Sequence, residues 1–297
     1  NIWYNLNEIP GNNIDDDNNG YVDDFRGWNF ADKNNDPMDQ DDHGTHVAGI
    51  IGAEGNNNIG IAGMTWDVKL MNLNVFGPNK TVPNPITHKA IRYATDNGAK
   101  IINLSLGSTT IGISSLAEFR ELSPSTYQAY YDTLKYASDR GVVIIAAIGN
   151  NAQSSDNALS VPACFSEVIP GMISVVAVSN RGQGSYYTNY GSKASIAAPG
   201  GDFSVGGRQG AVLSTVRGNG YNFKQGTSMA APVVSGAAAL MLARNSDLSP
   251  TEIKQILLDE ADSFKWLEDF VPNGKYLNVK KALIKAMKVP PIWKEIG

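Results

Sequence analysis

The chain has 297 residues, of which 42% are hydrophobic, so it is long and apolar enough to bury a substantial core. Its net charge of −5 is uneven, because residues 1–43 hold eleven acidic and two basic residues while the remainder is basic, and this balance disfavours a nucleic-acid partner. A single cysteine, Cys164, excludes an internal disulfide, and no apolar run approaches the roughly 20 residues of a membrane span.

The order of apolar runs along the chain predicts the fold class. Residues 5–42 are rich in Asn, Asp and Gly and hold no apolar run long enough for a core strand, so we expect a loop. From His43 onward, helical patterns alternate with β-branched runs at 68–75, 100–106, 142–148 and 173–178. This alternation predicts an α/β fold with a mainly parallel central sheet and helices on both faces. No linker or repeat divides the chain, so residues 1–297 are expected to form a single domain.

Two helices are predicted in detail. The first precedes Gly141, which stands where a helix ends, because apolar residues recur there at intervals of three and four. Its apolar face consists of Tyr127, Tyr130, Tyr131, Leu134 and Ala137. The second spans 250–261 and opens at "LSPTE", with Ser249 as the cap, proline in the first position and an acid in the third.

Small residues stand where catalytic groups gather in such sheets, at the carboxyl ends of strands. Gly107 follows the run at 100–106, and "GNN" (149–151) follows the run at 142–148. Ser228 lies in "GTSMAAPVVSGAAALML" (226–242), at the start of a long apolar helix. Two roles are open for its hydroxyl: a helix cap, or a group aimed out of the helix mouth, where free N–H groups favour a developing oxyanion.

A pair of histidines opens another helix, in "DDHGTHVAG" (41–49). Zinc-binding histidines on a helix are usually four residues apart, whereas His43 and His46 are three apart. The remaining histidine, His88, lies on an ordinary amphipathic helix. The pair alone leaves structural, metal-binding and catalytic roles open, and Cys164 is expected to be a core residue.

Four segments together carry a resemblance that covers nearly the whole chain. They are "DDHGTHVAGII" (41–51), "INLSLG" (102–107), "AAIGNN" (146–151) and "GTSMAAPVVSGAAAL" (226–240). In order and interval they are similar to the His, substrate-strand, oxyanion and Ser motifs of the subtilisin-like serine proteases, the subtilases of peptidase family S8. The resemblance implies a three-layer subtilisin-like fold and a serine endopeptidase that acts on protein or peptide substrates.

The resemblance implies a role for each matched residue. His43 becomes the general base and acid, Ser228 the nucleophile and Asn150 the side-chain donor to the oxyanion, while His46 becomes a buried structural residue. Substrate-binding positions follow in the same way. Ser105, Leu106 and Gly107 are expected to form an extended edge for the peptide, and Ser160 to lie near the floor of a roomy, largely apolar specificity pocket.

The third member of the triad is not found. The family's order is Asp, His, Ser, with the Asp following an apolar strand, and no such segment precedes His43. We therefore expect residues 1–297 to lack the central strand that carries this Asp, and an upstream segment or pro-segment to complete the fold. The alternative is a catalytically impaired relative or fragment that binds peptides without cleaving them.

The acidic segment predicts a Ca²⁺ site. "DDDNNGYVD" (15–23) matches the start of a calcium loop, although position 12 is Arg26 instead of Glu. The predicted ligands are Asp15, Asp17, Asn19, the carbonyl of Tyr21, Asp23 and Asp24. The open alternative is a solvated acidic loop.

A second segment, "GNNNIGIAG" (55–63), resembles the family's strong calcium loop through Asn57 and the carbonyls of Ile59 and Ile61. In the family that site also takes ligands from the upstream segment that we expect residues 1–297 to lack. Calcium and the family's usual export together imply a secreted or extracytoplasmic protein.

Overall fold

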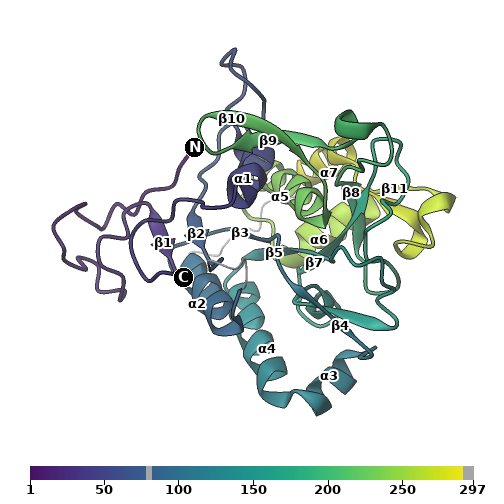
Figure 1. The fold of residues 1–297 in the computed structure, drawn as a ribbon, viewed down its shortest axis with the longest axis horizontal. Coiled ribbons are helices and arrows are strands. Elements are labelled where there is room, and N and C mark those ends of the chain that lie inside the picture. The colour runs from purple at the N-terminus through teal and green to yellow at the C-terminus, as the bar shows by residue number, and fades with distance from the viewer. Residues whose placement is uncertain (78–81, 290–297) are drawn as a thin grey trace.

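A computed structural model describes residues 1–77 and 82–289 of the chain (Figure 1). Its centre is a six-stranded sheet of order β11-β12-β8-β7-β5-β3, in which only β11 runs antiparallel to its neighbour. The strands are β3 (Ile101–Leu104), β5 (Val143–Ala147), β7 (Ile173–Val178), β8 (Ile196–Pro199), β11 (Asp262–Ser263) and β12 (Lys275–Tyr276). The predicted runs at 100–106, 142–148 and 173–178 are therefore strands of one parallel sheet.

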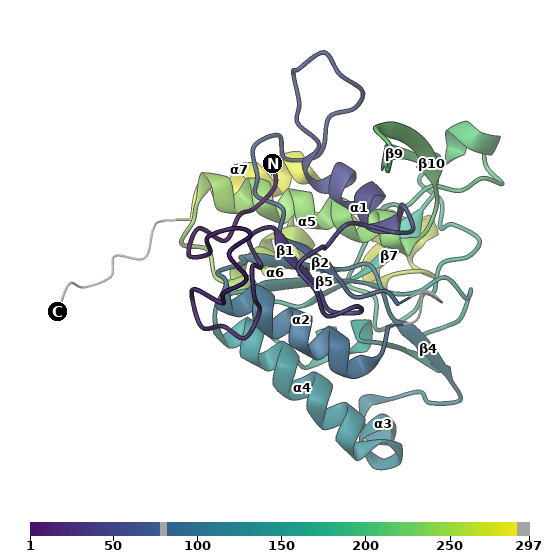
Figure 2. The ribbon, with the colours of Figure 1, turned by 60° about the vertical axis from the view of Figure 1, so that its left-hand side comes forward.

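Helices cover both faces of this sheet, as Figure 2 shows. One face carries α2 (Asn84–Asp96) and α4 (Pro124–Asp139), and the other carries α5 (Thr227–Arg244), α6 (Pro250–Asp259) and α7 (Val279–Ala286). Successive residues of β5 alternate between the two cores: Ile144 packs towards α2 and α4, and Ile145 towards α5 and α6. Both are fully buried, which explains why this strand reads as a continuous apolar run. The predicted α/β fold class is confirmed.

The remaining elements frame these layers. α1 (His43–Gly52) packs beside α5, and α3 (Leu116–Leu122) precedes α4. Two antiparallel pairs lie outside the main sheet, β4 (Ser108–Ile111) with β6 (Ala158–Val161) and β9 (Val212–Val216) with β10 (Gly220–Lys224). Short 3-10 helices span Ala163–Glu167, Gly207–Gly210, Lys265–Leu267 and Pro272–Gly274.

The helices predicted in detail are confirmed. α4 contains the predicted stripe, with Leu134 fully buried, and Ser249 and Glu252 form the capping box at the start of α6. Within the described part of the chain, only α5 is long and apolar enough to match a membrane span. Because 67% of it is buried inside the fold, it is a core helix.

The expectation that residues 5–42 hold no strand is wrong. β1 (Gly27–Asn29) pairs in parallel with β2 (Asn72–Asn74). A Cβ at residue 27 would lie 2.0 Å from the carbonyl oxygen of Asn72, so this pairing needs glycine. Trp28 and its neighbours form an aromatic cluster with Tyr21 and Tyr93. Polar residues separate these rings in the sequence, so a search for consecutive apolar residues misses the strand.

β2 and β3 are successive strands joined by α2, and Leu73 packs on the same core as Ile102. Figure 1 shows β2 between β1 and β3, yet β2 and β3 belong to different sheets. Asn74 accepts a hydrogen bond from Phe30, so alternation turns the backbone groups of Leu73 to the edge away from β1.

The same alternation identifies the backbone groups on the edge of β3 that faces β2. Lys100 accepts a hydrogen bond from Val143 of β5, so alternation turns the backbone N–H and C=O of Ile101 and Asn103 away from β5. No strand of residues 1–77 or 82–289 pairs with either of these two edges.

Candidate active site

Ser228 is the second residue of α5, at the positive end of an 18-residue helix. Gly226 precedes the helix with φ 152° and ψ 160°, a conformation open essentially to glycine alone. The Ser228 hydroxyl lies 3.4 Å from the carbonyl oxygen of Ser105, and the Ser105 hydroxyl donates to the carbonyl of Ser228 at 2.8 Å. The end of β3 and the start of α5 are thereby tied together.

Asn150 lies in the loop after β5, and its orientation is fixed by α5. Its Oδ1 accepts hydrogen bonds from the N–H of Thr227 at 2.8 Å and from the hydroxyl of Thr227 at 3.0 Å. With the amide oxygen engaged in this way, the Nδ2 group is the end of the side chain that remains to donate.

Ser228 and Asn150 line one cavity of about 190 Å³. The predicted substrate-binding residues Leu106, Gly107 and Ser160 line it too, whereas Ser105 lies behind it, against α5. The full lining is Leu106–Thr109, Ala147–Asn151, Ser160, Val161, Thr227 and Ser228, and none of these residues is ionisable. The structure thus brings together five of the predicted site residues around a neutral pocket. The expectation that this pocket is largely apolar is wrong, because seven of its thirteen lining residues carry a hydroxyl or an amide.

His43 is the first residue of α1, and its ring meets that of Phe76 edge-to-face at 5.7 Å. It is not among the residues that line the cavity. α1 is held on α5 by Val47, Ile50 and Met229, the residue after Ser228. The predicted base therefore stands on the helix that is packed against the predicted nucleophile's helix.

The start of α1 is ordered by Asp39. Its Oδ2 accepts hydrogen bonds from the N–H and the hydroxyl of Thr45, both at 2.7 Å. Burial alone raises the pKa of Asp39, but the bonds from Thr45 and Asp41, with the nearby His43, outweigh it and leave this pKa lowered. Asp39 is thus an ionised cap that fixes the turn leading into His43.

His46 is fully buried, as the resemblance implies. Its Nε2 lies 3.1 Å from the carbonyl oxygen of Val212 and 3.0 Å from that of Asn222, so Nε2 carries the proton. Burial lowers the pKa of His46, and its Nδ1 has no hydrogen-bond partner. A neutral imidazole therefore ties α1 to the β9–β10 hairpin.

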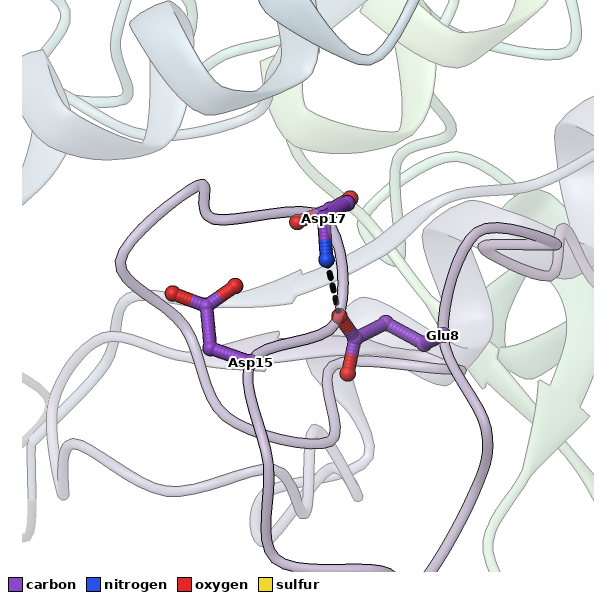
Figure 3. A group of neighbouring side chains, drawn as sticks. All are labelled: Glu8, Asp15 and Asp17. Atoms are coloured by element: carbon purple, nitrogen blue, oxygen red, sulfur yellow. Dashed lines mark hydrogen bonds between the residues drawn. The ribbon is translucent and has the colours of Figure 1, made fainter.

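The acidic loop places three carboxylates together: Glu8, Asp15 and Asp17 offer oxygens within 4.8 Å of one another (Figure 3). Glu8 is only 4% exposed. Its Oε1 accepts from the N–H groups of Asp16 at 2.8 Å and Asp17 at 3.2 Å, while its buried Oε2 has no partner. Burial raises the pKa of Glu8, and the carboxylates of Asp24 and Asp17 add to this. An orphaned carboxylate oxygen beside two more carboxylates fits a hard cation.

Of the other predicted loop ligands, Asn19 does lie at this cluster, because its backbone N–H donates to Asp15 at 3.0 Å and to Asp17 at 3.1 Å. Asp23, Asp24 and Tyr21 have other partners. Asp23 accepts hydrogen bonds from the backbone N–H groups of residues 11–13. Asp24 is fully buried and accepts from Asn5, Asn19 and, at 2.5 Å, the hydroxyl of Tyr93. Tyr21 lies in the aromatic cluster around β1. The sequence does not predict Glu8 as a ligand, because Glu8 precedes the recognisable loop by seven residues and carries no local motif.

The second predicted calcium segment has no carboxylate cluster. Asn57 Oδ1 accepts from the N–H of Ile59 at 2.9 Å, which closes a local turn in an exposed loop that also contains Ile61. The Glu8 cluster is the only such group in the described ranges.

The comparisons with known proteins identify the family. The profile of the subtilase family matches residues 4–282. The chain belongs to the subtilase family. This subtilase is 34% identical over 251 residues to the thermophilic serine proteinase of Bacillus sp. (strain AK1), covering 84% of this chain and 54% of that protein. It is 30% identical over 306 residues to subtilisin-like protease 1 of Plasmodium falciparum, covering 97% of this chain and 41% of that protein.

Solved structures agree with this assignment. A protease of Pseudoalteromonas arctica matches the subtilase with 31% identity and a TM-score of 0.67, over 82% of this chain and 70% of that chain. The subtilase spans about half the length of the two curated relatives named above.

The buried His46 predicts a pH-dependent stability. Its pKa is lower in the folded state than the value of about 6.5 in the unfolded state, so the unfolded state binds the proton first as pH falls. The free energy of unfolding should therefore decrease below about pH 6.5, by at most about 1.4 kcal/mol per pH unit for this group.

Urea unfolding between about pH 5 and pH 8 checks this, because His46→Gln should flatten the slope. Burial also lowers the pKa of His88, so His88→Gln is the matched control. This variant should lose only the contribution of His88 to the slope and keep the contribution of His46. An unchanged slope in His46→Gln would contradict the assignment.

Proposed function

We propose that this subtilase is a serine endopeptidase that cleaves protein or peptide substrates through an acyl-enzyme on Ser228. The observation that carries the proposal is the convergence of Ser228 and Asn150 on one cavity, at the positive end of α5. A hydroxyl at a helix N-terminus beside an oriented amide donor is the arrangement that acyl transfer to serine requires.

In the proposed reaction, the hydroxyl of Ser228 attacks the scissile carbonyl carbon while His43 accepts its proton. The resulting oxyanion accepts hydrogen bonds from the Nδ2 group of Asn150 and the backbone N–H of Ser228. His43 then protonates the leaving amine as the C–N bond breaks. A water molecule, deprotonated by His43, then attacks the ester carbonyl carbon. As the bond from that carbon to the oxygen of Ser228 breaks, His43 returns the proton to Ser228 and the carboxylic acid product leaves.

The neutral lining around Ser160 supports a preference for an uncharged side chain before the scissile bond, because a buried charge there would find no oppositely charged partner. Leu106 and Gly107, on the same cavity, are positioned to bind the backbone of an extended peptide.

An active-serine phosphonate probe tests the nucleophile. We expect it to label the protein at Ser228, with no label on Ser228→Ala and full labelling of Ser114→Ala, whose serine is exposed and distant in the chain. Asn150→Ala should slow peptide hydrolysis about 10- to 100-fold, because it removes a hydrogen bond to a charged group. A folded protein that binds peptides but takes no label would instead support the peptide-binding alternative.

We further propose that an upstream segment, or a pro-segment held as a separate chain, adds a strand between β2 and β3 and carries the triad Asp. The support is the pair of facing edges that the described strands leave unmatched. Unpaired backbone groups of a sheet are stabilised by strand addition.

Hydrogen exchange tests the added strand. The amide hydrogens of Leu73 and Asn103 should exchange quickly in residues 1–297 alone and become protected when the upstream segment is present. Peptide hydrolysis should rise at the same time, and fall again when the segment's Asp is replaced by Asn. Equal exchange of both amides with and without the segment would contradict the proposal.

We also propose that the protein binds Ca²⁺ through Glu8, Asp15 and Asp17, and that it works in a secreted or extracytoplasmic compartment. Three clustered carboxylates in a loop rich in backbone carbonyls fit the irregular oxygen shell of Ca²⁺ better than the strict octahedron of Mg²⁺. The bound ion would supply the partner that Glu8 Oε2 lacks and so hold the acidic loop in place.

Because the pKa of Glu8 is raised, Glu8→Gln should have opposite effects on stability, relative to the wild type, without and with calcium. Because the buried carboxylate is disfavoured when ionised, Glu8→Gln should be more stable than the wild type in a chelator at neutral pH. At about 100 times the dissociation constant, Ca²⁺ should stabilise the wild type by about 2.7 kcal/mol and Glu8→Gln much less.

Thermal unfolding with and without Ca²⁺ measures both effects. Glu54→Gln, which removes an exposed carboxylate, should respond to calcium like the wild type. Equal calcium responses in wild type and Glu8→Gln would show that Glu8 holds no ion.

A further inference from the structure

Asn189 is a buried polar residue next to the site that the proposed chemistry does not use. It lies between β7 and β8 and is only 1% exposed. Its side-chain Oδ1 accepts hydrogen bonds from the N–H groups of Asn151 at 3.0 Å and Gln153 at 3.1 Å. Its Nδ2 lies within donating distance of three oxygens: the carbonyl of Ile148 at 3.0 Å and the hydroxyls of Thr109 at 3.0 Å and Ser160 at 2.9 Å.

The first group of these bonds holds the loop that contains Asn150. The side chain of Asn189 bonds to Ile148 before Asn150 and to Asn151 after it, and its backbone N–H donates to the carbonyl of Gly149 at 2.9 Å. A Cβ at residue 149 would lie 2.4 Å from Nδ2 of Asn189, so glycine at φ 110° permits this close approach. The loop is therefore clamped on both sides of the oxyanion donor.

The second group holds the wall of the cavity. Thr109 of β4 and Ser160 of β6 are direct partners across that strand pair, and both line the cavity. The amide of Asn189 reaches both hydroxyls from behind, and Thr109 also donates to Oδ1 of Asn151 at 2.8 Å. Asn189 does not itself line the cavity, yet it joins the pocket wall to the oxyanion loop.

An amide of this length is the side chain that meets these requirements. Asn offers two donors and an acceptor with two lone pairs on one short stem, and here both ends are engaged. An aspartate would place a second oxygen against the carbonyl of Ile148, and a serine hydroxyl has a single proton to share between the loop and the wall.

We propose that Asn189 is a positioning residue that sets where the oxyanion donor lies relative to the side-chain pocket, and thereby selects the size of the substrate residue before the scissile bond. This inference rests on the proposed endopeptidase function. It assigns Asn189 no contact with the substrate, so its effect must pass through Asn150 on one side and through Thr109 and Ser160 on the other.

A double-mutant cycle in the full chain tests the first route. Asn189→Ala should lower kcat about 10- to 100-fold, as expected when a hydrogen bond to the oxyanion is misplaced. If Asn189 acts through Asn150, adding Asn189→Ala to Asn150→Ala should lower kcat by no more than about twofold. Additive losses would overturn this route, because a general loss of structure would affect both backgrounds equally.

Asn245→Ala is the matched control. Asn245 also donates from its amide to two backbone carbonyls, those of Ala286 and Val289, but it lies at the far end of α5. It should reduce thermal stability and leave kcat and substrate preference unchanged. A loss of kcat in Asn245→Ala equal to that in Asn189→Ala would overturn the proposal.

Peptide binding tests the second route without turnover. In the Ser228→Ala background, calorimetry compares two peptides that differ only in leucine or alanine before the scissile bond. The ratio of their dissociation constants should shrink at least about threefold when Asn189→Ala is added, because the pocket wall loses its anchor. An unchanged ratio would overturn the inference.

The binding arm also separates the two proposals. If the protein with Ser228 in place cleaves neither peptide while Ser228→Ala still distinguishes them, the endopeptidase function is contradicted. The ratio of the two dissociation constants then still tests the role of Asn189.

Discussion

The position of the site depends on the burial of α5 against the central sheet. This helix is apolar on every side, and residues such as Ala231, Val234 and Ala238 pack against β5 and β7. Small side chains let the helix approach the strands closely, and Gly236 continues this on the opposite side, where a Cβ would lie 2.2 Å from Met64. Because the helix is packed so closely, it cannot slide along its axis. This packing fixes the position of Ser228 at the start of the helix.

Polar contacts then connect the loops to this helix. Thr227 holds Asn150, Ser105 holds the carbonyl of Ser228, and Asn189 holds the loop around Asn150 from the opposite side. These bonds join segments far apart in the sequence, and most of them end on backbone groups. The apolar core sets the coarse position of the chemistry, and buried amides and hydroxyls set its finer geometry.

The features that the sequence predicts well are those with a local pattern. The sequence predicts β7 and α6 because a β-branched run and a capping box each lie within a few consecutive residues. Ser228, Asn150, Leu106 and Gly107 are predicted as site residues because four motifs keep a family's order. Glu8 and Asn189 carry no such signal, since what distinguishes them is burial by segments distant in sequence. Asp23 shows the reverse case, because a motif suggested a metal ligand where the fold uses the carboxylate to hold residues 11–13.

The unmatched edges of β2 and β3 also bear on how the molecule behaves during folding. Each edge offers a row of amides and carbonyls that any extended chain can satisfy, including the same edge of a neighbouring molecule. In the proposed completion by an added strand, binding of that strand competes with self-association, and the competition grows with concentration. Under that proposal, the same few backbone groups of β2 and β3 control both the joining of the two sheets and the tendency of the chain to self-associate.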